Sequence, residues 1–245
     1  MKKFCKRAYL ALILIFLYLP IIVLIVQSFN AGKSRAKWEG FSFRWYTELF
    51  QDTRIMNALT VTVTIALLAM VVATILGTLA AIGIHAMKKR PNTMPDIVTG
   101  ISLMLLFLFT KVDRGYVTML LAHITFDTPY VILSVLPKLK QMNRHTYEAA
   151  LDLGATPMYA LFHVIIPECM PGIITGAMLA FTLSLDDFTI SYFTTSPLVQ
   201  NLSTLIYSAA RRGIEPTLNA LSALMFVALL VLLLIVNRRT ASNND

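Results

Sequence analysis

Long apolar runs separated by short polar segments make up most of this chain. Six such runs cover residues 8–29, 59–84, 97–109, 116–136, 172–193 and 220–236. Five of them reach or approach the roughly 20 residues that an α-helix needs to cross a bilayer. The third has 13 residues, which suits a re-entrant segment or a buried helix whose ends are shielded by neighbouring spans. The pattern predicts an all-α membrane protein with six transmembrane helices, the third unusually short.

The composition supports a membrane protein and argues against nucleic-acid binding. Of the 245 residues, 57% are hydrophobic and 14% are charged, against about 25% charged residues in a typical soluble domain. The net charge is +8, but Lys and Arg fall in short clusters between the apolar runs. If the N-terminus is cytoplasmic, 12 of the 21 lie in cytoplasmic segments, including 88–90 and 238–239, as the positive-inside rule expects. We therefore expect both termini in the cytoplasm.

The N-terminal segment begins like a signal peptide. Its apolar run of 22 residues is long enough to span, however, and no small-residue cleavage motif follows. We read it as an uncleaved first transmembrane helix. The two cysteines, Cys5 and Cys169, both fall on the cytoplasmic side of this topology, where thiols stay reduced. We expect free thiols, with no disulfide, metal or cofactor.

The longest cytoplasmic segment, 137–171, contains a pattern that predicts two short helices around a turn. The pattern is Glu-Ala-Ala, three residues, Gly, nine residues, and then apolar-x-apolar-Pro; its fixed positions begin with Glu148, Ala149, Ala150 and Gly154 and end with Pro167. Residues 148–153 favour helix, Gly154 ends it, and a second helix can follow over 157–164. Such a projecting hairpin is a surface that another protein could cup, whereas a plain cytoplasmic loop is the alternative.

Motifs of enzymes are absent or incomplete in this sequence. Gly32-Lys33-Ser34 matches the end of a phosphate-binding loop, but Gln27 stands where its first glycine is needed, and the segment follows an apolar run instead of a strand. Neither HExxH nor GxSxG occurs. His123, within the polar stretch HITFDT of the fourth run, is read as a helix–helix hydrogen-bonding residue. We therefore do not expect an enzyme.

Two adjacent acids, Asp186 and Asp187, interrupt the fifth run. A carboxylate at mid-bilayer costs roughly 2.5–3.5 kcal/mol on insertion scales. Counted from Gly172, Asp186 lies about 21 Å along a helix that rises 1.5 Å per residue, towards the outer side. Ser184 and Asp187 would share a helical face. Because intramembrane acids mark ion or substrate paths, we predict that they are counter-charges for a cation; a structural pair satisfied by polar neighbours is the alternative.

These features together resemble the PotC-type permeases of spermidine/putrescine ABC importers. The Glu-Ala-Ala pattern resembles the EAA loop of bacterial ABC importer permeases, and the stretches WEGF, PDIV and SLDDF occur in the order of PotC-type chains; the similarity covers about residues 18–236. It implies a type I (MetI-like) permease fold, a single domain over 1–245 with its core at about 58–237 and its coupling loop at 137–171. The residues implied to contact an ATPase are Glu148, Ala149, Ala150, Gly154 and Pro167.

The resemblance also implies a substrate and partners. In PotC-type permeases an aromatic residue and an acid contribute to the polyamine path, which adds Trp45 and Asp96 to Ser184, Asp186 and Asp187. A polycation suits such residues because carboxylates replace the hydration of ammonium groups and aromatic rings give cation–π contacts. The implied partners are PotA-like ATPase subunits, a PotB-like second permease, a PotD-like polyamine-binding protein and membrane lipid.

The sequence departs from this family just before the third run. Relatives carry additional, largely apolar residues between the basic cluster at 88–90 and the Pro-Asp pair at 95–96, so the third span is shortened here and Asp96 moves towards the inner face. A deletion variant with impaired transport is therefore one alternative. A secondary or proton-coupled cation transporter that uses the aspartates as a relay is another, and a related permease for a different cationic or iron-complex solute is a third. Pro157, where relatives often carry a polar residue, can open a helix.

Overall fold

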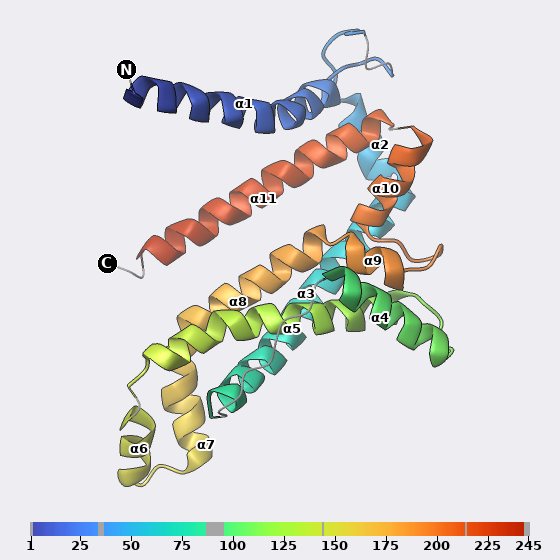
Figure 1. Cartoon of the computed structure of the whole chain (residues 1–245). Coiled ribbons are helices and arrows are strands. Elements are labelled where there is room, and N and C mark those ends of the chain that lie inside the picture. The colour runs from blue at the N-terminus through green and yellow to red at the C-terminus, as the bar shows by residue number, and fades with distance from the viewer. Residues whose placement is uncertain (1, 34–36, 87–95, 144, 214, 243–245) are drawn as a thin grey trace. The chain divides into compact units, whose positions relative to one another are not determined.

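The structure is a computed structural model that describes residues 2–33, 37–86, 96–143, 145–213 and 215–242 (Figure 1). Its described residues form helices and loops, with two isolated β-bridges and no strand, which confirms the predicted all-α class. The chain divides into two compact units, residues 1–56 with 206–245 and residues 57–205. The segment 90–95, on which the predicted shortening before the third run falls, lies outside the described residues.

The first unit pairs the two ends of the chain. Helix α1 (Lys2–Ser28) contacts α11 (Pro216–Ser242), and α11 also packs on the short helix α2 (Arg44–Gln51). Figure 1 shows that α1 and α11 run antiparallel, so that the start of α1 and the end of α11 lie at the same end of this unit. Paired antiparallel spans of this kind place both ends of a chain on one side of a membrane.

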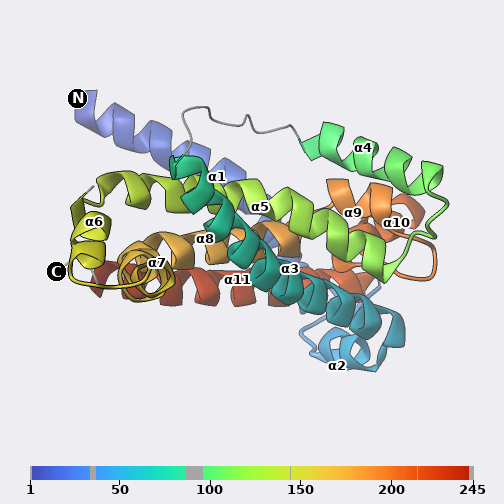
Figure 2. The ribbon, with the colours of Figure 1, turned by 90° about the horizontal axis from the view of Figure 1, so that it is seen from below.

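The second unit contains most of the remaining helices. They are α3 (Thr53–Ala86, from residue 57 on), α4 (Asp96–Phe109), α5 (Tyr116–Gln141), α6 (His145–Asp152), α7 (Pro157–Ala160), a π-helical turn (Leu161–Ile165), α8 (Ile166–Asp186) and α9 (Thr189–Thr194); α10 (Leu202–Arg212) begins at its end. Figures 1 and 2 show α6 and α7 at one end of the α5–α8 pair and α4 with α9 at the other. The short helices therefore lie at the two opposite ends of the α5–α8 pair.

Four helical segments are long and apolar enough to cross a membrane. They cover Tyr9–Ser28, Thr53–His85, Tyr116–Gln141 and Pro157–Asp186, and a shorter apolar stretch covers Pro216–Val231. Helix α4 has 14 residues, about 21 Å at 1.5 Å per residue, which is less than the roughly 30 Å of a hydrocarbon core. The prediction of a short third segment is confirmed, whereas the fifth run does not continue as one helix over 172–193, because α8 ends at Asp186.

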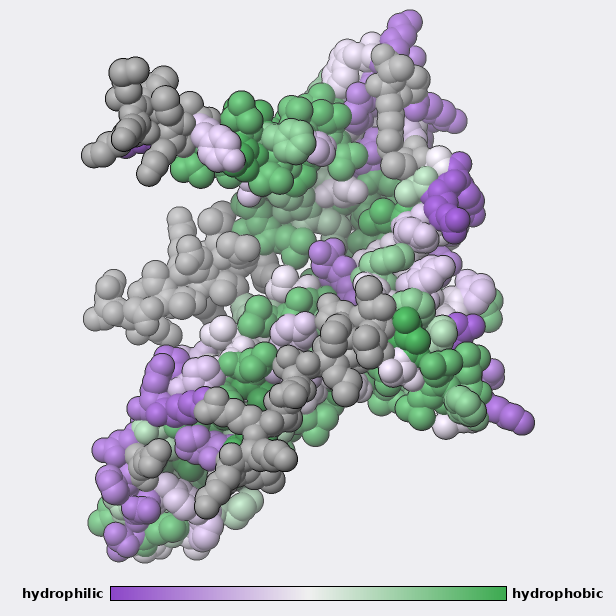
Figure 3. Space-filling view, viewed as in Figure 1, coloured by the Kyte–Doolittle hydropathy of each residue, from purple (hydrophilic) through white to green (hydrophobic). Residues whose placement is uncertain are grey.

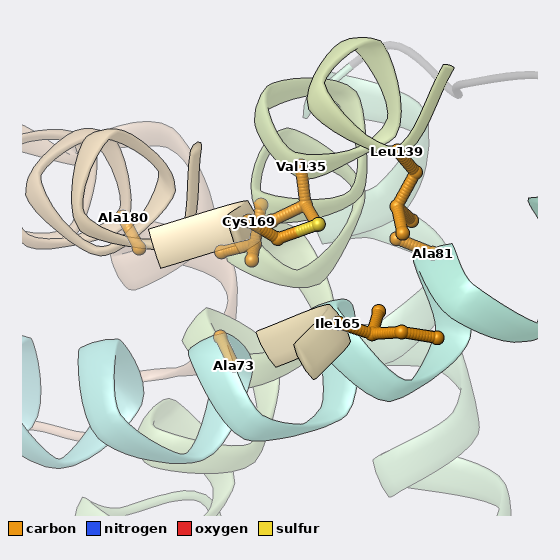
Figure 4. Packing of buried hydrophobic residues seen from close by; sticks show 8 residues of the cluster. Ala73, Ala81, Val135, Leu139, Ile165, Cys169 and Ala180 are labelled. Carbon is orange, nitrogen blue, oxygen red and sulfur yellow. The ribbon is translucent and has the colours of Figure 1, made fainter. Parts of the chain in front are cut away.

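Helices α5 and α8 form the most extensive contact between elements in this unit. Their buried side chains, with those of α3 and of the π-helical turn, make one apolar cluster (Figure 4); its members are Ala73, Ala81, Val131, Val135, Leu139, Ile165, Cys169 and Ala180. Cys169 is buried with a free thiol. Small residues on α8 permit the close approach: a Cβ atom at Gly172 would lie 3.0 Å from the Ser134 carbonyl oxygen, and one at Gly176 would lie 3.2 Å from Val131 Cα. This is the small-x-x-x-small pattern of membrane helix pairs.

The helical hairpin in 137–171 forms as the sequence predicts. Helix α6 ends before Gly154, whose φ of +86° is a left-handed conformation that favours glycine. The Thr156 hydroxyl accepts a hydrogen bond from the Tyr159 backbone N–H at 3.3 Å, and Pro157 opens α7. The expectation that the second helix stops at residue 164 is wrong, because α7, the π-helical turn and α8 follow one another without a break. The backbone here has no αL residue or turn that would end the helix.

The two glycine environments give a matched test of the α5–α8 contact. Gly172→Ala should lower the free energy of unfolding by about 1–3 kcal/mol, because its methyl group would meet Lys138 and the Ser134 carbonyl group. Gly83→Ala, on α3, should be neutral or stabilising, since an added Cβ has no neighbour within 4 Å there and alanine favours helix. Thermal or denaturant unfolding of both purified variants in detergent measures the difference; equal effects would contradict the close-packing account.

Candidate functional site

The two aspartates lie at a break between two helices. Helix α8 ends at Asp186, Asp187 has extended backbone angles (φ −65°, ψ 123°), and α9 begins at Thr189. The predicted sharing of one helical face by Ser184 and Asp187 therefore rests on a helix that does not continue to Asp187. Non-helical backbone at membrane depth is tolerated only where it is buried in protein or lines a cavity, so this break marks a special position.

Asp187 stabilises the start of α9. Its Oδ1 accepts a hydrogen bond from the Ile190 N–H at 3.2 Å, and its Oδ2 accepts one from the Ser191 N–H at 2.8 Å. Its side chain is 7% exposed. Both bonds satisfy donors that the first turn of a helix leaves unpaired, and a negative charge is favourable at that helix end. Part of the burial of this acid is thus explained by local structure.

His123 of α5 links α8 to α9. Its Nδ1 lies 2.6 Å from Ser184 Oγ and its Nε2 lies 2.9 Å from Ser191 Oγ, which confirms the prediction of a helix–helix hydrogen-bonding residue. Asn201 Nδ2 donates to Ser191 Oγ at 2.7 Å and to the Asp187 carbonyl oxygen at 3.2 Å. These four residues and the Asp187 backbone form one connected buried polar cluster.

Partner chemistry indicates how protons are arranged in this cluster. Ser191 Oγ already accepts from Asn201, so its own hydrogen can go to His123 Nε2. A neutral His123 then carries its proton on Nδ1 and donates to Ser184 Oγ. His123 Nε2 also lies 3.7 Å from Asp187 Oδ2, within range of an ion pair if the imidazole is protonated. The cluster can therefore place either a dipole or a positive charge beside the carboxylate.

The structure separates the roles of the two adjacent acids. Asp186 is exposed on the surface of this chain, whereas Asp187 is held by backbone N–H groups next to His123. Ser184 is buried and used by His123. Of the predicted substrate-path residues, these three gather at one end of α8, and Asp186 has the carboxylate that is open to a ligand.

Two other predicted path residues are placed elsewhere or not described. Trp45 is 2% exposed on α2, in the other unit, and its Nε1–H donates to the Asn30 carbonyl oxygen at 2.5 Å. Asp96 is the first residue of α4, and its side chain lies outside the described residues. A role of either residue in a substrate path stays a prediction.

Sequence reasoning assigned no role to one buried acid close to this cluster. Asp127 lies one helical turn after His123 on α5, is 0% exposed, and has no hydrogen-bond partner for either carboxylate oxygen among the described residues. Leaving such a group unsatisfied costs about 1–3 kcal/mol or more. The i, i+4 spacing of His123 and Asp127 within an apolar run was the available signal.

A second candidate site lies at the opposite end of this unit. A groove of 530 Å³ is lined by residues of α6, α7 and their turn; they include Ala150, Leu153, Gly154, Ala155, Thr156 and Tyr159. Leu153 is 89% exposed there, and Met158, Tyr159 and Phe162 are exposed as well. Figure 3 shows hydrophilic residues over the α6 end and hydrophobic ones over α4. Exposed apolar side chains around a groove at the polar end indicate a protein-docking surface.

Among the described residues, no group of three or more His, Cys, Asp or Glu side chains could hold a metal ion. The arrangement offers a hydrophobic multi-helix body, acids at a helix break at one end and a helical docking hairpin at the other. Such an arrangement is typical of a multi-pass membrane protein of the transport-permease class.

Comparison with known proteins agrees with this class. The chain matches the family of binding-protein-dependent transport system inner membrane components over residues 1–240, and it belongs to that family. It is 42% identical over 231 residues to the putrescine transport system permease protein PotI of Escherichia coli K12, covering 87% of this chain and 82% of the relative. It is 35% identical over 252 aligned residues to the spermidine/putrescine transport system permease protein PotC of Haemophilus influenzae, covering 98% of both chains.

A solved structure shares the fold. It is the crystal structure of a bacterial ABC transporter involved in the import of the acidic polysaccharide alginate, with a TM-score of 0.71, 19% identity and coverage of 98% of each chain. At this identity the likeness shows the fold alone. The chain is therefore a permease subunit with an ABC-importer permease fold, and the predicted fold class is confirmed.

The capping role of Asp187 gives a stability contrast with Asp186. Asp187→Ala should lower the free energy of unfolding by about 0.5–2 kcal/mol, because two N–H groups of α9 lose their acceptor. Asp187→Asn should cost less, since one side-chain oxygen remains. Asp186→Ala should change stability by less than about 0.5 kcal/mol, as expected for an exposed side chain. Thermal unfolding of the three variants in detergent tests the order; a larger loss in the Asp186 variant would overturn it.

Proposed function

We propose that this chain is a membrane-spanning permease subunit of an ATP-driven importer for polyamines, putrescine and spermidine among them. The observation that carries the proposal is the exposed Asp186 at the helix break beside buried Asp187. Carboxylates placed at that depth suit a linear polycation, whose ammonium groups need acceptors when they lose water. The polyamine transport named for the relatives PotI and PotC supports the same substrate class.

The partners that we propose follow from the family of this chain. Its family is the inner-membrane component of binding-protein-dependent systems, so a separate binding protein delivers the solute. We propose a PotD-like binding protein, a PotB-like second permease that completes the pathway, and PotA-like ATPase subunits. The antiparallel α1–α11 pair supports placing both termini on one side, and the basic residues near the termini favour the cytoplasmic side.

Energy from the ATPase would enter through the α6–α7 hairpin. The helical segment Pro157–Asp186 connects this hairpin to the aspartates, and it changes direction between α7 and α8 at the π-helical turn Leu161–Ile165 (Figure 2). Helix α8 alone has 21 residues, about 32 Å at 1.5 Å per residue. A displacement of the hairpin would tilt α8 and thereby change access to Asp186 at its other end. Transport requires that the two end states bind the polyamine with different affinity.

Uptake measurements test the substrate. Cells that lack other polyamine importers and express this chain with its partner subunits should accumulate radiolabelled spermidine saturably, with competition by putrescine. Asp186→Asn should raise KM by about 10–100-fold, the equivalent of a lost charge-assisted hydrogen bond of 1.5–3 kcal/mol. Uptake of another solute that neither polyamine competes with would refute the proposal in favour of a permease for a different substrate. Uptake that persists without the ATPase and is lost with the proton gradient would instead indicate a proton-coupled carrier. Normal assembly without any uptake would indicate a deletion variant with impaired transport.

A pair of exposed leucines tests the docking surface. Leu153→Asp, in the α6–α7 groove, should abolish co-purification with the ATPase subunits or reduce polyamine-stimulated ATP hydrolysis at least tenfold, because a charge would enter an apolar contact. Leu198→Asp is the control: this leucine is 95% exposed in the segment after α9, at the other end of the unit. Equal effects of the two substitutions would show that the groove is not the coupling site.

A further inference from the structure

Asp127 is a buried acid whose carboxylate oxygens take part in none of the hydrogen bonds between described residues. It is 0% exposed on α5, and neither carboxylate oxygen has a hydrogen-bond partner among the described residues. The remaining unpartnered buried side-chain atoms in the described part of the chain are hydroxyl groups of Thr74, Thr78 and Thr217. A hydroxyl can rotate to donate to a carbonyl group of its own helix, whereas a carboxylate is an acceptor and cannot do so.

The described neighbours offer this acid at most the Ser184 hydroxyl, whose hydrogen is free when its oxygen accepts from His123 Nδ1, although neither carboxylate oxygen makes a hydrogen bond to it in this structure. Both ring nitrogens of His123, one turn earlier on α5, are engaged by Ser184 and Ser191. Thr125 and Thr128 donate to carbonyl oxygens four residues back in α5. None of the described ion pairs includes Asp127. Among the described residues, no Lys or Arg side chain therefore pairs with this acid.

The donor that fits is a positively charged group with several N–H bonds. A primary or secondary ammonium can donate to Asp127 and to the Ser184 hydroxyl while Asp187 adds a favourable field. We propose that Asp127 binds one ammonium group of the transported polyamine, as an inner site behind the exposed Asp186. This inference rests on the proposed function, because it requires that the solute is a polycation.

The same geometry implies that the inner site is closed in this structure. Asp127 is fully buried where α5 packs on α8 and α9. An ammonium group can reach it only when the helix break at Asp187–Phe188 moves away from α5. The His123–Ser191 and Thr118–Thr194 hydrogen bonds between α5 and α9 would have to break in that movement. Asp186 would meet the solute first and Asp127 would bind it after opening.

The test is polyamine uptake into proteoliposomes that contain the assembled transporter with its ATPase and binding protein. Asp127→Asn keeps the volume and removes the charge. Asp127→Ser is the second variant, because a hydroxyl can donate to its own helix as Thr125 and Thr128 do. Asp113→Asn is the matched control, an acid exposed in the loop between α4 and α5. KM and kcat for spermidine are measured for each, with and without a protonophore.

The inference expects KM to rise at least tenfold in both Asp127 variants and less than twofold in the Asp113 variant, with no change on adding the protonophore. KM within twofold of the unsubstituted chain would overturn it. If the Asp127 variants instead lower kcat at unchanged KM, and uptake falls when the protonophore is added, Asp127 carries a proton and does not bind an ammonium group. Loss of assembly in both Asp127 variants, with a normal Asp113 variant, would make the acid structural. If the unsubstituted chain shows no saturable uptake, the proposed function is refuted, and the inner site is refuted with it.

Discussion

The close approach of α5 and α8 is the contact on which the rest of the larger unit depends. In a bilayer, lipid tails are as apolar as leucine, so burial alone does not drive two helices together; shape and hydrogen bonding decide. Gly172 and Gly176 bring the α8 backbone near Val131 and the Ser134 carbonyl group. At that separation the His123 ring reaches Ser184 across the helix pair, which a wider interface would prevent. Packing at one end of the pair therefore fixes polar geometry at the other.

The polar cluster explains how a membrane span can tolerate a broken helix. Where α8 stops, the backbone groups of the next turn lose their helical partners, and each unsatisfied group would be costly in hydrocarbon. Asp187 accepts two N–H bonds at the start of α9, and Asn201 donates to the Asp187 carbonyl oxygen. Further bonds hold the segments after the break: Thr118 Oγ1 donates to the Thr194 carbonyl oxygen, and the Leu202 N–H donates to Thr62 Oγ1. The break is thus a built feature, supported from α3 and α5.

This organisation separates structural from solute-facing acids. Asp187 accepts hydrogen bonds from backbone N–H groups, Asp186 is exposed, and Asp127 is buried without a hydrogen-bond partner among the described residues. The three carboxylates thereby have three different environments. The docking hairpin is joined to the acids through the π-helical turn and α8, so a movement of the hairpin can act on the acids by tilting α8. Both halves of the proposed transport cycle, solute binding and coupling, are joined by one helix.

The pattern of residues alone predicts the membrane class, the positions of most long helices and the hairpin around Gly154, because hydrophobic runs and glycine turns act locally. The same pattern shows the acids that interrupt an apolar run, and the motifs resemble those of PotC-type permeases, a resemblance with which the relatives PotI and PotC agree. Only the tertiary structure showed that α8 ends at Asp186, that Asp187 caps α9, and that Trp45 is engaged by the Asn30 carbonyl group. The state of Asp127 was equally invisible, since the partners of a buried polar group come from other helices. Periodicity tells which residues leave water; which donor each one meets depends on packing between segments far apart in the chain.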